Sequence, residues 1–294
     1  MATLSSTSAA LGAISSARRI DAMAYTLHGP VLWALEDAAR RGTHVAVELE
    51  GAPFNDARGA LARENARLAN ELRAAGADVR LTHVHAKALA VDDALYLDDR
   101  NWGVDDIVLR DTNDRDVQAA RDVFDGNGAP DPTSKNFALH KRDALTIEAR
   151  LLASARPDDD VIVETESFGY SNPVYTALEQ LARRGLHPRL LVSERDLRHN
   201  TRMRSALDRL ASDGVRVRTC ADSEKLAVVA NRAWIGSANA SPAFEHPDPT
   251  DWGLRTADEK IATAARTRFE RNWSKAHCVS NPVIRCCGAA RPET

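Results

Sequence analysis

The chain carries one sequence block twice, as ALEDAARRG at residues 34–42 and as ALEQLARRG at residues 177–185. A second pair of similar blocks follows, LRAAGADVR at 72–80 and LASDGVRVR at 210–218. The offset is 143 positions for the first pair and 138 for the second, so one intervening loop differs in length by five residues. Such internal similarity indicates that one structural unit has been duplicated.

Each copy predicts the same order of elements: strand, helix, strand, helix, strand, a hairpin-like pair of short strands, and a final strand and helix. Apolar residues spaced by three and four, as over residues 61–72, predict the helices, and Gly42 and Gly185 stand where helices should stop. Residues 125–132 have the composition of a linker, and a helix over about 138–155 is expected to open the second half. The fold class predicted is α/β, with a mixed sheet flanked by helices in each copy.

The composition suits a folded protein with a sizeable core, since 44% of the 294 residues are hydrophobic and 28% are charged. The net charge of -3 argues against strong non-specific attraction to nucleic acid. No apolar run approaches the ~20 residues of a membrane span. Residues 1–17 lack a basic start followed by an apolar block, so they suggest a lead-in helix or a loose tail rather than a secretory signal. A cytoplasmic location is therefore expected.

Four cysteines, Cys220, Cys278, Cys286 and Cys287, lack the Cys-x-x-Cys spacing of zinc sites. Reduced thiols are expected for a cytoplasmic chain. The adjacent pair Cys286 and Cys287 is interpreted as part of an incidental tail, with metal binding or lipid attachment as the alternatives.

The first copy contains a polar stretch that can carry chemistry, HVHAKALAVD at residues 83–92. If this stretch is a strand, side-chain alternation puts His83, His85 and Lys87 on one face. An imidazole beside an ammonium group is suited to attack on a phosphate diester. The histidine can form a covalent phospho-enzyme, and the lysine can neutralise charge on the phosphoryl oxygens.

The pattern His85-x-Lys87, with Asp92 five positions after the lysine, resembles the signature of the phospholipase D superfamily. In that family a Gly-Ser-x-Asn run follows and helps to hold the phosphate. The first copy has Asn101 at the place of the family asparagine, but aspartates at 98 and 99 stand where Gly-Ser is expected.

The second copy departs from the family pattern at complementary places. It has the full run Gly-Ser-Ala-Asn at 236–239, and Lys225 corresponds to Lys87. However, Ser223 stands where the histidine is expected, and Ala230 stands where the aspartate is expected.

The resemblance implies two phospholipase D-like units related by a pseudo-twofold axis, at residues 18–128 and 129–276, followed by a tail at 277–294. It also implies one shared anion pocket and chemistry that needs neither metal nor cofactor. The site residues carried over are catalytic His85, Lys87 and Asp92, and phosphate-binding Asn101, Lys225, Ser237 and Asn239. Asp92 is expected to orient its neighbours rather than to react.

The function implied is a phosphodiesterase or phosphatidyltransferase that acts through a phosphohistidine. The alternative is a catalytically degenerate protein that binds phosphate-containing ligands, lipid or nucleic acid, without turnover. A phospholipid substrate is favoured over nucleic acid because the chain is acidic, and peripheral contact with a membrane is compatible with that substrate. A monomer is favoured because one chain supplies both units, with a homodimer as the alternative.

Several polar residues near the motif have two interpretations. His83 is expected at the rim of the site, and the sharper hypothesis is that it replaces the missing second histidine. Asp98 and Asp99 are expected in a turn, or with Asp99 neutralised by Arg100. Alternation should turn Glu224, like Asp222, away from the cleft. The tryptophans at 102, 252 and 273 are expected to pack in the core.

Overall fold

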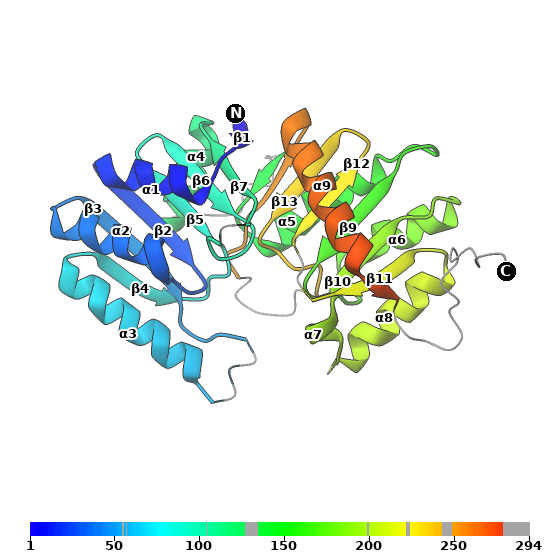
Figure 1. Cartoon of the computed structure of the whole chain (residues 1–294), viewed down its shortest axis with the longest axis horizontal. Helices are drawn as coiled ribbons and strands as arrows, with labels where there is room; N and C mark the ends of the chain where they lie inside the picture. The colour runs from blue at the N-terminus through cyan, green and yellow to red at the C-terminus, as the bar shows by residue number, and fades with distance from the viewer. Residues whose placement is uncertain are drawn as a thin grey trace.

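The computed structural model describes residues 1–54, 56, 58–103, 105–126, 135–198, 200–221, 224–242 and 249–278. They form two α/β units side by side, the first drawn in blue to cyan-green and the second in green to red (Figure 1). Each unit has its own mixed sheet. The α/β class and the two-unit architecture expected from the duplicated blocks are therefore confirmed.

The first unit has a seven-stranded sheet in the order β1-β7-β6-β5-β2-β3-β4. The strands β2, β3 and β4 are parallel, and the others pair antiparallel. Its strands are β1 (Ala2–Leu4), β2 (Arg19–Ala24), β3 (His44–Glu50), β4 (Asp78–Thr82), β5 (Ala88–Val91), β6 (Ala94–Asp98) and β7 (Val108–Asp111). Its helices are α1 (Thr7–Ser16), α2 (Gly29–Arg40), α3 (Ala60–Ala75) and α4 (Asp114–Phe124).

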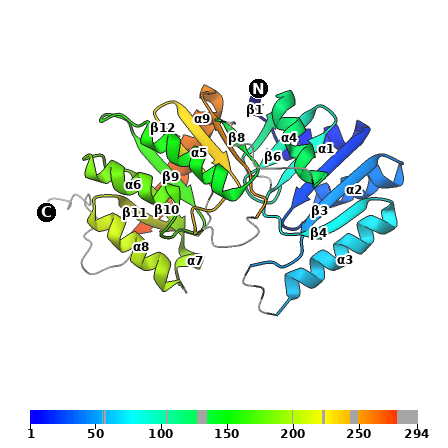
Figure 2. The ribbon, with the colours of Figure 1, turned by 180° about the vertical axis from the view of Figure 1, so that it is seen from behind.

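The second unit repeats this plan in an eight-stranded sheet, in the order β15-β11-β10-β9-β12-β13-β14-β8. Its strands are β8 (Phe137–Ala138), β9 (Val161–Thr165), β10 (Arg189–Ser193), β11 (Arg216–Cys220), β12 (Leu226–Val229), β13 (Arg232–Gly236), β14 (Gly253–Thr256) and β15 (His277–Cys278). Its helices are α5 (Lys141–Ala153), α6 (Pro173–Arg183), α7 (Glu194–Arg198), α8 (Thr201–Ser212) and α9 (Glu259–Lys275). Seen from behind, α5 and α6 cover the face of the sheet opposite to α9 (Figure 2).

The repeat begins earlier in the chain than the boundary at residue 18 that the sequence suggested. Strand β1 pairs antiparallel with β7, as β8 pairs with β14 in the second unit. Strand β1 and helix α1 thus complete the first unit, because a strand on β7 covers an edge that would otherwise expose unpaired backbone groups. At the other end, His277 and Cys278 pair with β11, so the expected tail starts inside the sheet.

Three hydrophobic cores hold the molecule together. One lies under α1, α2 and α3 of the first unit, and one under α5, α6 and α8 of the second. The third is shared: it contains Val84 and Ala86 from the first unit, and Leu226 and Trp252 from the second, together with the buried faces of α4 and α9. Since burial of apolar area is the main stabilising term in such a contact, this shared core fixes the two units against each other.

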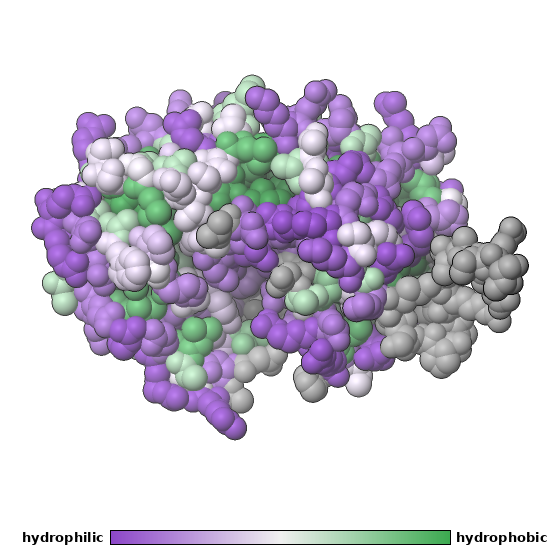
Figure 3. Space-filling model, in the orientation of Figure 1, coloured by the Kyte–Doolittle hydropathy of each residue, from purple (hydrophilic) through white to green (hydrophobic). Residues whose placement is uncertain are grey.

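Among the residues that the structure describes, the large hydrophobic side chains that remain exposed belong to the first unit: Met1, Leu4, Trp33, Phe54 and Leu81. In the view of Figure 3, hydrophilic residues cover much of the second unit, and hydrophobic areas appear on the first unit and where the units meet. Within the described ranges, none of the helices combines the length and the apolar character that a bilayer span would need.

Candidate active site

The segment that carries His85 is held by backbone contacts from the other unit. The N–H groups of His85 and Ala86 donate to the carbonyl of Thr250 over 2.8 and 2.7 Å, and the N–H of Thr250 donates to the carbonyl of His83 over 3.2 Å. The sequence suggested that residues 83–87 belong to a strand. They form instead an irregular segment before β5. The alternation still holds for Val84 and Ala86, which are buried in the shared core.

This contact brings a buried aspartate to the imidazole. Nδ1 of His85 lies 2.8 Å from Oδ1 of Asp251, which also accepts a 2.6 Å hydrogen bond from Oγ of Ser237. Burial alone raises the pKa of Asp251, but His85, Lys141 and Lys87 together outweigh it and the pKa is lowered, so this side chain is a carboxylate. The backbone N–H of Trp252 donates to Ser237 over 2.9 Å and fixes the hydroxyl in place.

The protonation of His85 follows from these neighbours. Burial, and then the charge of Lys87, lower the pKa of the imidazole, so it is neutral at neutral pH. A carboxylate can only accept, which places the proton on Nδ1 and the lone pair on Nε2. Nε2 makes no hydrogen bond within the described part of the chain, and 23% of the side chain is exposed. The ring is thus a neutral imidazole in a partly exposed side chain.

Two buried lysines accompany the histidine, one from each unit. Lys87 is 2% exposed and Lys225 is 4% exposed. Nζ of Lys87 donates to the carbonyl of His85 over 2.6 Å and lies 5.6 Å from the centre of the Tyr25 ring. Burial, followed by the charge of Lys225, lowers the pKa of Lys87 to about 8. Two buried ammonium groups, the second of which lowers the affinity of Lys87 for its proton, form a site suited to an anion.

A further carboxylate, Glu166, completes the cluster. Its Oε2 lies 3.4 Å from Nζ of Lys225, and its Oε1 accepts a 2.8 Å hydrogen bond from Arg195. Burial raises the pKa of Glu166, but its cationic neighbours, Lys225 first and Lys87 and Arg195 with it, outweigh this effect and lower the pKa below its usual value, so Glu166 is ionised. Sequence reasoning missed it, although one signal was available: Glu166 directly follows β9, as Tyr25 directly follows the matching strand β2.

The two motif asparagines lie in different settings. Oδ1 of Asn239 accepts a 3.2 Å hydrogen bond from the N–H of Ser167, so it holds the segment next to Glu166. Asn101 is exposed, and only its backbone N–H is bonded, to Asp106 over 3.1 Å. The backbone of Trp102 has a φ of 65°, so the chain here takes a different course from that of the corresponding run in the second copy. None of the described contacts around His85 therefore supports the expectation that Asn101 contacts the phosphate.

Asp92 lies at the opposite end of β5 from His85, so it cannot touch a group that reacts there. Its carboxylate accepts hydrogen bonds from the N–H groups of Arg18, over 3.1 Å, and Arg19, over 3.0 Å. Its φ of 45° shapes the turn between β5 and β6. The catalytic assignment of Asp92 is corrected to a structural one, in keeping with the orienting role expected for it.

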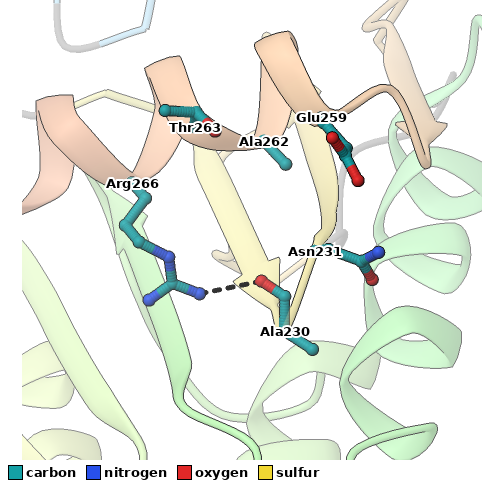
Figure 4. Close-up of a pocket in the computed structure, with 6 residues that line it drawn as sticks. All are labelled: Ala230, Asn231, Glu259, Ala262, Thr263 and Arg266. Carbon is teal, nitrogen blue, oxygen red and sulfur yellow. Dashed lines mark hydrogen bonds between the residues drawn. The ribbon is translucent and has the colours of Figure 1, made fainter.

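In the second unit Ala230 takes this turn position with the same backbone conformation, φ 53°, and without a carboxylate. A small pocket lies beside it, between the β12–β13 turn and α9 (Figure 4). Arg266 donates to the carbonyl of Ala230 over 2.9 Å there. The pocket is at the far end of β12 from Lys225 and does not belong to the cluster.

Asp98 and Asp99 are fully buried rather than placed in a surface turn. Each accepts a backbone hydrogen bond, Asp98 from Trp102 over 2.5 Å and Asp99 from Ile107 over 2.9 Å. Burial, followed by the charge of Asp106, raises the pKa of Asp98 to about 8, so it is mainly protonated at neutral pH. These aspartates therefore do not repel an anion as two full charges would.

The expected neutralisation of Asp99 by Arg100 is not observed. Arg100 pairs instead with Asp106 over 2.7 Å, and with Glu224 over 3.5 Å. Burial, and then the charge of Glu224, raise the pKa of Asp99 well above its usual value. Glu224 is itself buried and pairs with Arg268 over 3.0 Å, so it lies in the contact between the units.

His83 lies beside the cluster rather than in it. Its Nδ1 is 3.2 Å from Glu50, and 35% of its side chain is exposed. This is the rim position that was expected for it. Asp222, Ser223, Cys286 and Cys287 lie outside the described residues, as do residues 127–132 of the predicted linker.

Comparisons with known proteins bear on this geometry. A family model described as "Cardiolipin synthase, PLD-like domain" matches residues 149–273. No curated protein matches the chain.

Among solved structures, polyphosphate kinase from Porphyromonas gingivalis is 16% identical with a TM-score of 0.66, over 93% of this chain and 47% of that one. The chain thus spans about half the length of that kinase. Phosphatidylserine synthase from Haemophilus influenzae Rd KW20 is 12% identical with a TM-score of 0.64, over 95% of this chain and 87% of that one. At these identities the likeness concerns the fold. The family model thus matches residues 149–273 of the second unit, and the two-unit fold of the whole chain is similar to the folds of these two solved structures.

Proposed function

We propose that this chain is a phospholipase D-like phosphodiesterase or phosphatidyltransferase in which His85 forms a phosphohistidine. The observation that carries the proposal is the 2.8 Å contact between Nδ1 of His85 and the buried carboxylate of Asp251. It directs the lone pair of Nε2 to a place where Lys87 and Lys225 can bind an anion. A neutral imidazole, an orienting carboxylate and two cations are the groups that nucleophilic attack on a phosphodiester requires.

In the first step Nε2 forms a bond to phosphorus while the bond from phosphorus to the leaving oxygen breaks. The leaving oxygen takes a proton from water. Asp251 stabilises the positive charge that develops on the imidazole ring, as the aspartate of a catalytic triad does. Lys87 and Lys225 offset the charge on the non-bridging oxygens. Water or an alcohol then attacks the phosphohistidine, which gives hydrolysis or transfer respectively.

The other motif residues act through these groups. Ser237 donates to Asp251 and so sets the position of the carboxylate that orients His85. Asn239 holds Ser167, and with it the segment that contains Glu166. Both are therefore proposed as positioning residues rather than as direct ligands of the phosphate.

A phospholipid is the proposed substrate class, in preference to nucleic acid, because the chain has a net charge of -3. Peripheral contact with a membrane is proposed for the first unit. Phe54 is 74% exposed, and its backbone is hydrogen-bonded to Tyr25, whose ring packs against His85 at 5.2 Å between centroids. An exposed aromatic residue next to the cluster is suited to the interface of a bilayer. One chain supplies both lysines, which favours an active monomer.

The test is His85→Asn, assayed with bis(4-nitrophenyl) phosphate. Loss of the nucleophile should lower kcat by about 10³-fold or more while the protein stays folded. Wild-type protein, quenched during turnover, should carry a phosphoryl adduct on the peptide that contains His85. His187→Asn, at an exposed histidine bonded to Gly214, is the matched control and should keep its activity. Full activity in His85→Asn would remove this residue from the mechanism.

Binding of phosphate-containing ligands without turnover is the second candidate function. It is favoured by Ser223 at the place of the second histidine and by the ion pair of Lys225 with Glu166. The same quench experiment separates the two candidates: a phosphoryl adduct on His85 excludes binding alone, and its absence together with sulfate binding supports it.

A further inference from the structure

The second half of the proposed reaction needs a base, because water must lose a proton as it attacks the phosphohistidine. At the position that corresponds to His85, the second unit has Ser223 in place of a histidine. We propose that Glu166 is the catalytic base that activates this water. The inference rests on the proposed function, because it concerns the breakdown of the intermediate formed on His85.

The position of Glu166 suits this role. His85 comes from the first unit and Glu166 from the second, and Lys87 and Lys225 lie with them. Glu166 interacts electrostatically with all three of these groups. A phosphoryl group held by the two lysines would therefore have the histidine on the side of the first unit and the carboxylate on the side of the second unit. Displacement at phosphorus needs this arrangement, because the attacking and leaving atoms stand roughly in line.

The two oxygens of Glu166 have different surroundings. Oε1 accepts a hydrogen bond from Arg195, whereas Oε2 faces Lys225 at 3.4 Å, a distance that leaves it able to accept from water. The side chain is 29% exposed, so water can reach it. Asp251 cannot take this role, since its side chain is 2% exposed and one oxygen already binds both His85 and Ser237.

The backbone on both sides of Glu166 is fixed. Its carbonyl accepts a 3.2 Å hydrogen bond from Ser193, and the next residue, Ser167, donates to Asn239 over 3.2 Å. Geometry held in this way is what general-base catalysis demands, because the base must stay within hydrogen-bond reach of the water.

When water attacks the phosphohistidine, its oxygen forms a bond to phosphorus while the bond from phosphorus to Nε2 breaks. The electron pair of that bond returns to Nε2. One proton of the water passes to Glu166, which then releases it to solvent. The products are the phosphomonoester and neutral His85, and Glu166 is again a carboxylate.

Glu166→Gln tests the inference, because the amide keeps the shape of the side chain and cannot accept the proton. With bis(4-nitrophenyl) phosphate, we expect a stoichiometric burst of nitrophenol at the wild-type rate. Steady-state turnover should then fall by about 10²–10⁴-fold, the usual contribution of a positioned base. The phosphoryl adduct on His85 should accumulate. Glu194→Gln is the matched control, since this glutamate directly follows Ser193 and lies in the exposed ion pair with Arg198.

Wild-type steady-state turnover in Glu166→Gln would overturn the inference, and so would an equal loss in the burst and in the steady state. Either result leaves the proposed function intact if His85→Asn is inactive. Failure of the wild-type protein to release nitrophenol or to form the adduct would instead overturn the proposed function. Should the amide variant not fold, Glu166→Asp keeps the charge but withdraws it by one methylene. It should then slow the breakdown of the adduct without slowing its formation.

Discussion

Lys87 shows how far burial alters a single side chain at this site. It is 2% exposed, and burial and the nearby charge of Lys225 lower its pKa to about 8. Besides the hydrogen bond to the carbonyl of His85, its ammonium group can donate two more, which an anion can accept. Its charge at physiological pH is therefore sensitive to small changes in pH, unlike that of an exposed lysine.

Binding of sulfate, whose own charge is constant over this range, should reveal the titration of Lys87. As pH rises through about 8, Lys87 loses its proton and the site loses a positive charge. The affinity for sulfate should consequently fall by up to about tenfold per pH unit above that value. Calorimetric titration with sulfate between pH 6.5 and 9.5 measures this affinity. Lys87→Met should bind weakly with a flatter profile, and Lys260→Met, at an exposed lysine on α9, should follow the wild type. An unchanged wild-type affinity across this range would contradict the assignment.

At the scale of the element, α5 (Lys141–Ala153) carries a charge on the face that it buries. Ala144, Leu145, Ile147, Leu151 and Leu152 of this helix are buried, and Glu148 lies among them at 2% exposure. Burial raises the pKa of Glu148 to about 8. A carboxyl group in this position binds its proton more tightly in the folded than in the unfolded chain, so it destabilises the fold once the pH exceeds its unfolded value.

Stability should accordingly fall as pH rises from about 5 to 8, by on the order of 3 kcal/mol from this one group. In Glu148→Gln that part of the pH dependence should disappear, so the variant gains on the wild type as pH rises. Urea unfolding of both proteins at pH 5 and pH 8 gives the comparison. Glu71→Gln, an exposed change on α3, is the control. Parallel pH dependence of Glu148→Gln and the wild type would show that Glu148 does not titrate in this way.

For the whole molecule, the contact between units both stabilises the fold and assembles the site. Residues next to Asp251 serve both purposes: Thr250 accepts hydrogen bonds from the His85 segment, and Trp252, fully buried, donates from Nε1 to the carbonyl of Asp98 over 3.0 Å. Stability and catalysis are therefore expected to change together when this contact is weakened.

Trp252→Phe should remove the hydrogen bond to Asp98 and leave its carbonyl buried without that partner. The cost should be about 1–3 kcal/mol of unfolding free energy. Because Asp251 is adjacent, kcat should fall as well, and thermal unfolding with the diester assay measures both. Trp33→Phe changes a tryptophan that is 62% exposed on α2, and neither quantity should change in it. If Trp252→Phe lowered the stability but left kcat unaltered, the contact between the units would not contribute to catalysis at the site.

Local patterns were sufficient for much of the fold. Apolar spacing and glycine positions predicted the helices and strands of both copies, and the duplicated blocks predicted their common order. They did not predict β1, because three residues carry too little pattern to distinguish a strand from a tail. Nor did they predict the loop around Asn101, whose course is set by Asp106 and by the left-handed backbone of Trp102.

The sequence by itself determined the duplicated plan, the elements of each unit, and the histidine and lysines that can meet a phosphate. Only the tertiary structure decided which carboxylates lie beside them. His85 and Asp251 are separated by 166 positions. Glu166 meets Lys225 because β9 pairs with β12, and it comes near Lys87 only through the contact between the two units. Periodicity specifies which way a side chain points from its own strand or helix, but distances between remote groups depend on how the cores pack, and no local pattern encodes them.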